Sequence, residues 1–149
     1  MPDRREFVRA ISGLAVAPLI PTAAIAQTDP FAPLIAAFTG GAPVRAGRVT
    51  VDTPTLADNG NAVPLRIVID SAMTAADHVQ KVVVLSEKNP RPVIATFHLG
   101  PHAGRGVIVT RVRLNGAQRL MAIAQLADGT YWSGSADVIV TSTACWDES

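Results

Sequence analysis

From residue 44 onward, apolar and polar residues alternate with a period of two, and this pattern constrains the fold more than any other feature. Successive side chains of a β-strand point to opposite faces of a sheet, so the alternation predicts strands with one buried face. The segments of strand length are 49–51, 63–69, 79–85, 93–97, 107–114, 120–126 and 137–141. Their number and spacing predict an all-β protein, a two-sheet sandwich of about seven strands.

Two dipeptides predict tight antiparallel hairpins between neighbouring strands. Asn115-Gly116 and Asp128-Gly129 are residue pairs that adopt positive φ readily, as two-residue hairpin turns require. We therefore predict an antiparallel meander in the second half of the domain. Ser133-Gly134-Ser135 is predicted to form a further turn, and it lacks the Gly-x-Ser-x-Gly pattern of a hydrolase nucleophile.

A short N-terminal helix is predicted over residues 31–38. Apolar side chains recur there at helical spacing, and Gly40-Gly41 follows as a stop signal. Beyond this helix, no internal linker or repeat divides the chain. We therefore predict one folded domain over residues 27–149.

Residues 1–26 have the features of an export signal. Arg4-Arg5 precedes a weakly apolar, alanine-rich stretch, and Ala24-Ile25-Ala26 matches a small-x-small cleavage pattern. This resembles a bacterial twin-arginine signal, with Asp3 where the motif usually has Ser or Thr. A buried N-terminal helix would not need arginines clustered ahead of it. We therefore expect the mature chain, residues 27–149, to be located in the periplasm.

Charge and hydropathy exclude two classes of partner. The formal net charge is only +1, so no strong positive field exists to attract nucleic acid or anionic lipid. The apolar stretches after residue 26 have the length of strands rather than of membrane spans. We therefore expect neither nucleic acid nor a membrane as a partner.

Metal, cofactor and enzyme motifs are weak in this sequence. His98 and His102 flank Gly100-Pro101, which rules out a helical pair of ligands, and His78 lies in a separate polar segment. A copper-binding sandwich would place His and Met just after its ligand cysteine, but only four residues follow Cys145. We therefore predict no metal site, no cofactor and no self-contained catalytic site, with the histidines on the surface or in loops.

The candidate functional residue is Cys145, the one cysteine of the chain. It follows the last predicted strand, where a short tail could present its thiol to other molecules. Two alternatives are a small apolar side chain packed inside the domain and a disulfide to a second copy. No Lys, Arg or His lies within ten residues to lower the thiol pKa, so any activation would have to come from a partner.

Four ordered motifs cover much of the domain. They are Leu-Ala-Asp-Asn-Gly-Asn-Ala-Val-Pro at 56–64, Asp-Ser-Ala-Met-Thr at 70–74, Glu-Lys-Asn-Pro-Arg-Pro at 87–92 and Thr-Arg-Val-Arg-Leu at 110–114, followed by Gln118 and Asp128-Gly129. Together they resemble the pattern of the SoxY family, the sulfur carrier subunits of bacterial thiosulfate-oxidising systems. The resemblance covers nearly all of residues 31–145.

The resemblance implies an immunoglobulin-like antiparallel β-sandwich that pairs with a SoxZ-like subunit and is exported with it as a folded heterodimer. It also implies that Cys145 covalently holds thiosulfate-derived sulfur. A haem-containing enzyme would conjugate the thiosulfate, and a sulfate-releasing hydrolase and a sulfane dehydrogenase would then process it. The chain would be a non-catalytic carrier. Arg111 and Arg113 would either line the subunit contact or point outward from a strand.

The sequence departs from this family at the carrier arm. The family has Gly-Gly-Cys-Gly-Gly, whereas Thr143-Ala144-Cys145-Trp146-Asp147 keeps the cysteine and none of the four glycines. Each lost glycine stiffens the arm, and Trp146 adds bulk beside the sulfur. Two interpretations therefore stay open: a working sulfur carrier, and a divergent SoxY-like binding subunit of a SoxYZ-type heterodimer that has lost sulfur transfer.

Overall fold

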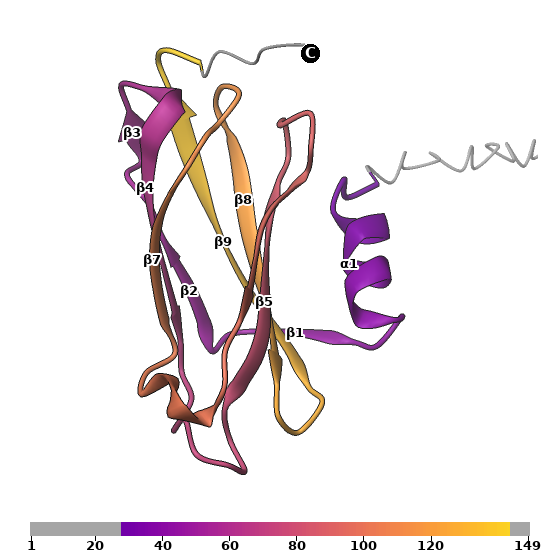
Figure 1. Ribbon diagram of the computed structural model, residues 1–149. Helices are drawn as coiled ribbons and strands as arrows, with labels where there is room; N and C mark the ends of the chain where they lie inside the picture. The colour runs from indigo at the N-terminus through magenta and orange to yellow at the C-terminus, as the bar shows by residue number, and fades with distance from the viewer. Residues whose placement is uncertain (1–27, 144–149) are drawn as a thin grey trace, which may run out of the picture.

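The computed structural model of the protein describes residues 28–143, so the predicted export signal (1–26) and Cys145 lie outside the described residues. The described chain forms two face-to-face sheets with one α-helix beside them (Figure 1). Its elements are α1 (Ala32–Thr39), β1 (Val44–Ala46), β2 (Val49–Asp52), β3 (Leu56–Ala57), the 3-10 helix η1 (Gly60–Ala62), β4 (Val63–Ile69), β5 (Val79–Ser86), β6 (Val93–His98), the 3-10 helix η2 (Pro101–Ala103), β7 (Val107–Val112), β8 (Gln118–Leu126) and β9 (Tyr131–Val140). None of the helices within residues 28–143 has the length and apolarity needed to cross a membrane.

The larger sheet has the strand order β1-β9-β8-β5-β6, with β3 added beside β9, and the smaller sheet has the order β2-β4-β7. All seven predicted strands form, and the all-β sandwich is confirmed. Two short strands, β1 and β3, were not predicted, and both run parallel to β9. The long strands pair antiparallel, as expected.

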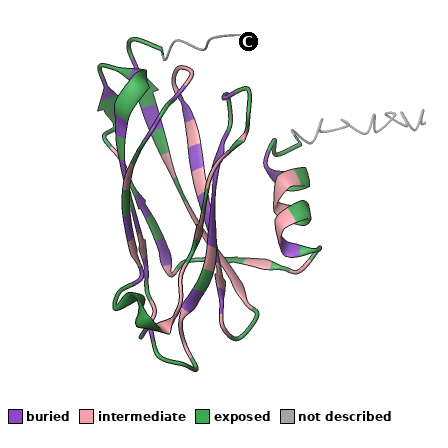
Figure 2. Ribbon diagram, viewed as in Figure 1, coloured by how far each residue is buried: buried purple, intermediate pink, exposed green. Residues whose placement is uncertain are grey.

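The core lies between the two sheets, and the alternation that predicted the strands is visible in their burial (Figure 2). In β4, every second side chain is buried, beginning at Val63. In β5, the last five residues are all buried, because the core covers one face and α1 covers the other. This second cover explains why the sequence of β5 is almost continuously apolar.

The predicted N-terminal helix is confirmed as α1. Pro33 fits its first turn, and Gly40, with φ of 65°, ends it in a left-handed conformation. The helix packs its apolar side chains on the outer face of the larger sheet. The cluster comprises Phe31, Leu34, Ile35 and Phe38 from the helix and its start, and Val44, Val83, Leu85, Met121, Ile123 and Tyr131 from the sheet.

One predicted hairpin is confirmed and the other is wrong. Asp128-Gly129 joins β8 to β9, which pair with each other, and Gly129 has φ of 81°. Gly116 also has a positive φ, 86°, but Asn115-Gly116 joins β7 in one sheet to β8 in the other. The positive φ predicted at this dipeptide is present at Gly116, but the pairing of β7 with β4 and of β8 with β5 places the two strands in different sheets. The second half is therefore not a meander.

The turn predicted at Ser133-Gly134-Ser135 is also wrong, because all three residues lie inside β9. Gly134 is needed there for close approach between the sheets. A Cβ atom on Gly134 would lie 2.1 Å from the carbonyl oxygen of Val49 on β2. A side chain of any size would therefore push the two strands apart.

Candidate functional site: the chain end and the neighbouring groove

The chain is held firmly after β9 ends at Val140. The N–H of Thr141 donates to the carbonyl oxygen of Ala57 at 3.0 Å, and its hydroxyl donates to the carbonyl oxygen of Asp58 at 3.1 Å. The N–H of Gly60 then donates to the carbonyl oxygen of Ser142 at 2.7 Å. The backbone is therefore fixed to the domain as far as Ser142.

The first family-like motif provides this anchor. Its residues Leu56 and Ala57 form β3, which pairs in parallel with the end of β9. The side chain of Asn59 accepts a hydrogen bond from the N–H of Asn61 at 2.9 Å and so caps η1. The carbonyl oxygen of Gly60 accepts a bond of 2.8 Å from the N–H of Leu114, just after β7. The motif thus has a structural role: it sets the point at which the C-terminal tail leaves the domain.

The tail leaves beside the connection between β7 and β8. A Cβ atom on Gly116 would lie 3.6 Å from the Cγ2 atom of Thr143. Cys145 itself lies outside the described residues, and its role as the carrier residue stays a prediction.

A buried polar network stiffens the same end of the sandwich. Asn89, only 6% exposed, donates through Nδ2 to the carbonyl oxygen of Arg113 at 2.7 Å. Its Oδ1 atom accepts from the N–H of Asn115 at 2.9 Å and from Nε2 of Gln118 at 3.1 Å. The hydroxyl of Ser86 donates to Oε1 of Gln118. The third family-like motif and Gln118 therefore lock the loop after β5 to the connection after β7.

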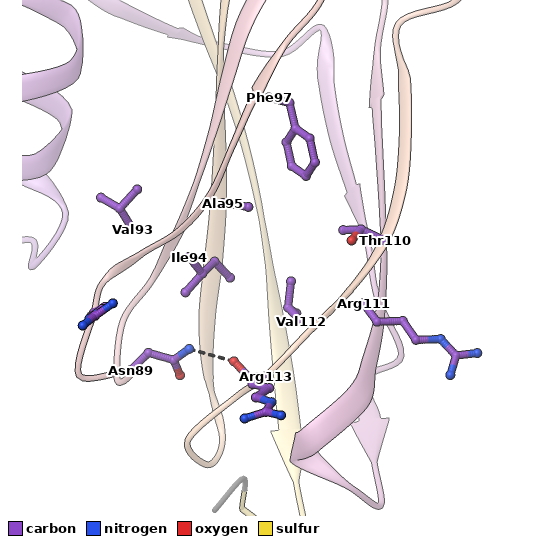
Figure 3. A pocket seen from close by; sticks show the side chains of 10 residues that line it. Asn89, Val93, Ile94, Ala95, Phe97, Thr110, Arg111, Val112 and Arg113 are labelled. Atoms are coloured by element: carbon purple, nitrogen blue, oxygen red, sulfur yellow. Dashed lines mark hydrogen bonds between the residues drawn. The ribbon is translucent and has the colours of Figure 1, made fainter. Parts of the chain in front are cut away.

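A groove opens between β6 and β7, the facing edge strands of the two sheets (Figure 3). Its volume is about 540 Å³. We call it the arginine groove, and it is lined by Asn89, Arg91, Val93, Ile94, Ala95, Phe97, Thr110, Arg111, Val112 and Arg113. Asn89 and Arg113 lie together at one end, which is the end where the tail leaves the domain.

The arginine groove is positively charged. Its lining contains three arginines, all exposed, and among the described residues no Asp or Glu contributes to it. Within residues 28–143 two ion pairs form, Arg48 with Asp77 and Arg119 with Asp29, and neither involves a groove arginine. Arg111 on β7 and Arg113 just after it are both exposed, and a role for them in a subunit contact stays a prediction. The groove itself was missed, because it forms from two strands that are not paired with each other.

The motif at 70–74 lies at the opposite end of the sandwich and stabilises a loop. Arg48 contacts the Asp77 carboxylate through Nη2 at 3.1 Å, and the hydroxyl of Ser71 donates to the carbonyl oxygen of Asp77 at 3.0 Å. The N–H of Ala72 also donates to the carboxylate and, with Arg48, lowers the pKa of Asp77 below its ordinary value. This motif therefore has a structural explanation that does not involve a ligand.

The histidines are dispersed over the domain. His98 on β6 and His102 in η2 are exposed, and Nδ1 of His78 lies 2.9 Å from the carbonyl oxygen of Thr74. Within residues 28–143, no group of three or more His, Cys, Asp or Glu side chains is arranged to hold a metal ion.

Comparison with solved structures shows a shared fold. The chain resembles the sulfur carrier protein SoxY from Chlorobium limicola f thiosulfatophilum with 22% identity and a TM-score of 0.61, over 73% of this chain and 94% of that one. It also resembles a superoxide reductase (neelaredoxin) from Ignicoccus hospitalis with 13% identity and a TM-score of 0.55, over 63% and 80% of the two chains. A putative superoxide reductase from Thermotoga maritima gives 16% identity and a TM-score of 0.53, over 69% and 89%.

Sequence comparison identifies the family. No curated protein sequence matches the chain. The family described as sulfur oxidation protein SoxY matches residues 35–145, which is most of the chain and includes the anchor motif, the arginine groove and Cys145. This chain therefore belongs to the SoxY family.

Proposed function

We propose that this chain is a sulfur carrier of a sulfur-oxidation system and that Cys145 covalently holds the sulfur. The observation that carries this proposal is that the family match extends to Cys145, three residues beyond the last anchored residue, Ser142. A rigid domain with a thiol just past its anchor suits a protein that delivers a bound group to other proteins. Membership of the family and the likeness to a SoxY sulfur carrier support this role.

The loading step forms one disulfide-type bond. The Cys145 thiol loses its proton to solvent, and its sulfur bonds to the outer sulfur of thiosulfate. Two electrons pass to a haem-containing oxidising partner, which leaves Cys-S-S-SO₃⁻ on the chain. A hydrolase would then add water to the sulfonate sulfur, break the outer S–S bond, release sulfate and leave a persulfide on Cys145. The chain supplies the attachment point, and its partners supply the catalysis.

The proposal includes a second subunit and a location. We propose a heterodimer with a SoxZ-like subunit, exported as a folded complex through the twin-arginine signal at residues 1–26 and active in the periplasm. Family membership supports the pairing, and the arginine pair and the cleavage pattern support the location.

Intact mass measurement tests sulfur carriage. The heterodimer is incubated with thiosulfate and its oxidised haem partner, and the chain should gain the mass of one S₂O₃ group. The Cys145→Ser variant should gain nothing, and neither should the unaltered chain when the haem partner is left out. An unmodified chain under turnover conditions, or an equal gain on the variant, would contradict the proposal.

A second candidate function is a binding subunit that keeps the heterodimer and has lost sulfur transfer. The absence of all four arm glycines favours it, because a stiff arm with Trp146 beside the sulfur enters a narrow active site poorly. Replacing residues 143–149 with a glycine arm should then create sulfur loading that the unaltered chain lacks. Loss of thiosulfate oxidation in cells carrying Cys145→Ser would refute this candidate. Mobility on a non-reducing gel separately tests whether Cys145 links two copies.

A further inference from the structure

We propose that the arginine groove is the docking site of this chain's own C-terminal segment, Trp146 to Glu148. In this groove, apolar side chains occur together with arginines that make no ion pair, beside the point where the tail leaves the domain. The inference goes beyond sulfur carriage and does not depend on it. It concerns where the tail resides when no other protein holds it.

The tail is long enough to reach the groove. Thr143 lies beside Gly116, and Arg113 is in the same short connection, three residues earlier in the chain. Asp147 follows Thr143 by four residues, a span of about 14 Å at most. Asn89 lines the groove and holds the backbone at Arg113, so the arginine-rich end of the groove has a fixed position next to the tail.

The C-terminal segment and the arginine groove have opposite charges. Asp147 and Glu148 are adjacent carboxylates, whereas the described lining of the groove contains three arginines and no acidic residue. An arginine side chain can bind a carboxylate through two parallel N–H···O bonds. Figure 3 shows Arg113 at the Asn89 end of the groove and Arg111 extending outward from β7. Carboxylates leaving the domain near Thr143 therefore meet Arg113 first.

The C-terminal segment and the arginine groove also both contain apolar side chains. Between the two strands the groove is lined by Ile94, Ala95, Phe97 and Val112, and Val93 is 45% exposed. Trp146 precedes the two acids in the tail, so the tail has an aromatic group next to its negative charges. Tryptophan and arginine are the side chains that most often anchor a protein interface. The groove thus offers both kinds of contact that this tail can use.

Docking within one chain has an advantage over docking of a second copy. The tail is tied to the domain a few residues from the groove, so its effective concentration there reaches the millimolar range. Docking would also bring Cys145, two residues before Asp147, close to guanidinium groups that favour a thiolate. The domain itself would then supply the positive charge that the local sequence around Cys145 lacks.

A spin label tests the docking directly, because Cys145 is the one cysteine of the chain. A nitroxide is attached to Cys145 of the isotope-labelled full-length chain, and broadening of backbone amide signals is measured. We expect broadening at Val93, Thr110 and Arg111 in addition to the connection at 114–117. We call the broadening at Val93, Thr110 and Arg111 the groove component. Raising the salt concentration to about 1 M, where the Debye length is about 3 Å, should remove it. The double variants D147N/E148Q and R111Q/R113Q should lose the same component.

Arg105→Gln is the matched control, because Arg105 is exposed and precedes β7, whereas Arg113 follows it. This variant should keep the groove component. A mixture of spin-labelled chain without isotopes and isotope-labelled chain without the nitroxide should show no groove broadening. Broadening confined to 114–117 and equal in all variants would overturn the proposal. So would groove broadening that appears in the mixed sample, which would assign the groove to a second copy.

Discussion

The two sides of the sandwich are built from the same two sheets but close differently. On one side, β2 lies against β9, and Gly134 lets the backbones approach until a Cβ atom would be 2.1 Å from the carbonyl oxygen of Val49. On the other side, β6 and β7 both carry large side chains, and a groove of about 540 Å³ separates them. We call the first side the sealed side, because Gly134 has no side chain to keep β2 and β9 apart. We call the second the open side, because the groove between β6 and β7 can accept a ligand or a peptide.

The largest expected effect on stability comes from adding a side chain at Gly134, where β2 and β9 are in close contact. Gly134→Ala should lower the free energy of unfolding by about 3 kcal/mol, because the new methyl group clashes with backbone atoms that can move only with β2. Urea unfolding measures this effect. Gly100→Ala is the matched control, since a Cβ atom there meets nothing within 4 Å and its backbone is extended. Equal stability of the two variants would refute the account of the sealed side.

The next effect concerns the network at the end of the open side. Asn89→Ala should lower the free energy of unfolding by about 2 kcal/mol, because it leaves buried partners at Gln118 and the backbone of Arg113 and Asn115 without their hydrogen bonds. Asn61→Ala removes an exposed amide and should cost about 0.5 kcal/mol or less. If the Asn89 variant unfolds like the Asn61 variant, the network does not stabilise this end.

The groove arginines should affect the tail and leave stability unchanged. The R111Q/R113Q variant replaces exposed side chains, so its free energy of unfolding should stay within about 0.5 kcal/mol of the unaltered chain. A protease that cuts after acidic residues should cleave at Asp147 and Glu148 roughly threefold faster in this variant, because cleavage follows the undocked fraction. Mass spectrometry of the products gives the rate. The same rate in the unaltered chain would contradict a docked tail.

The smallest expected effect lies beside the sealed side, where Arg48 precedes β2 and pairs with Asp77. The N–H of Ala72 and the charge of Arg48 lower the pKa of Asp77 in the folded protein below its ordinary value of 3.8. The stabilisation is therefore present above that value and is lost as pH falls through the lower, folded-state pKa. Asp77→Asn should unfold with a smaller loss of stability between pH 7 and pH 3 than the unaltered chain. Asp52→Asn, exposed on β2, is the control, and an equal pH response of the two variants would argue against this ion pair.

The sequence predicted what depends on local pattern. Alternation located the seven main strands, and helical spacing located α1, because each records which side chains face the core. The sequence failed where two distant segments decide the outcome. Gly116 has the positive φ of a hairpin turn yet joins two sheets, and Gly134 lies in a strand because β2 passes close to it.

In the candidate site too, local sequence features could be predicted, and features that depend on long-range pairing could not. The sequence alone singles out Cys145 as a lone thiol beyond the last predicted strand, and the motif at 56–64 as family-like. That this motif anchors the chain end follows only from the parallel pairing of β3 with β9. The arginine groove could not be predicted, because Arg91, in the loop before β6, and Arg111, on β7, are 20 positions apart and belong to different sheets.

The most direct test of the central claim, sulfur carriage on Cys145, is to map the sulfur on chain taken from cells that are oxidising thiosulfate. Peptides from the purified heterodimer are sequenced by mass spectrometry without a reducing agent. We predict that the peptide containing residues 143–149 carries the added sulfur on Cys145 and that cells without thiosulfate yield the bare thiol. A bare thiol under both conditions, in cells that oxidise thiosulfate at the normal rate, would contradict the carrier role.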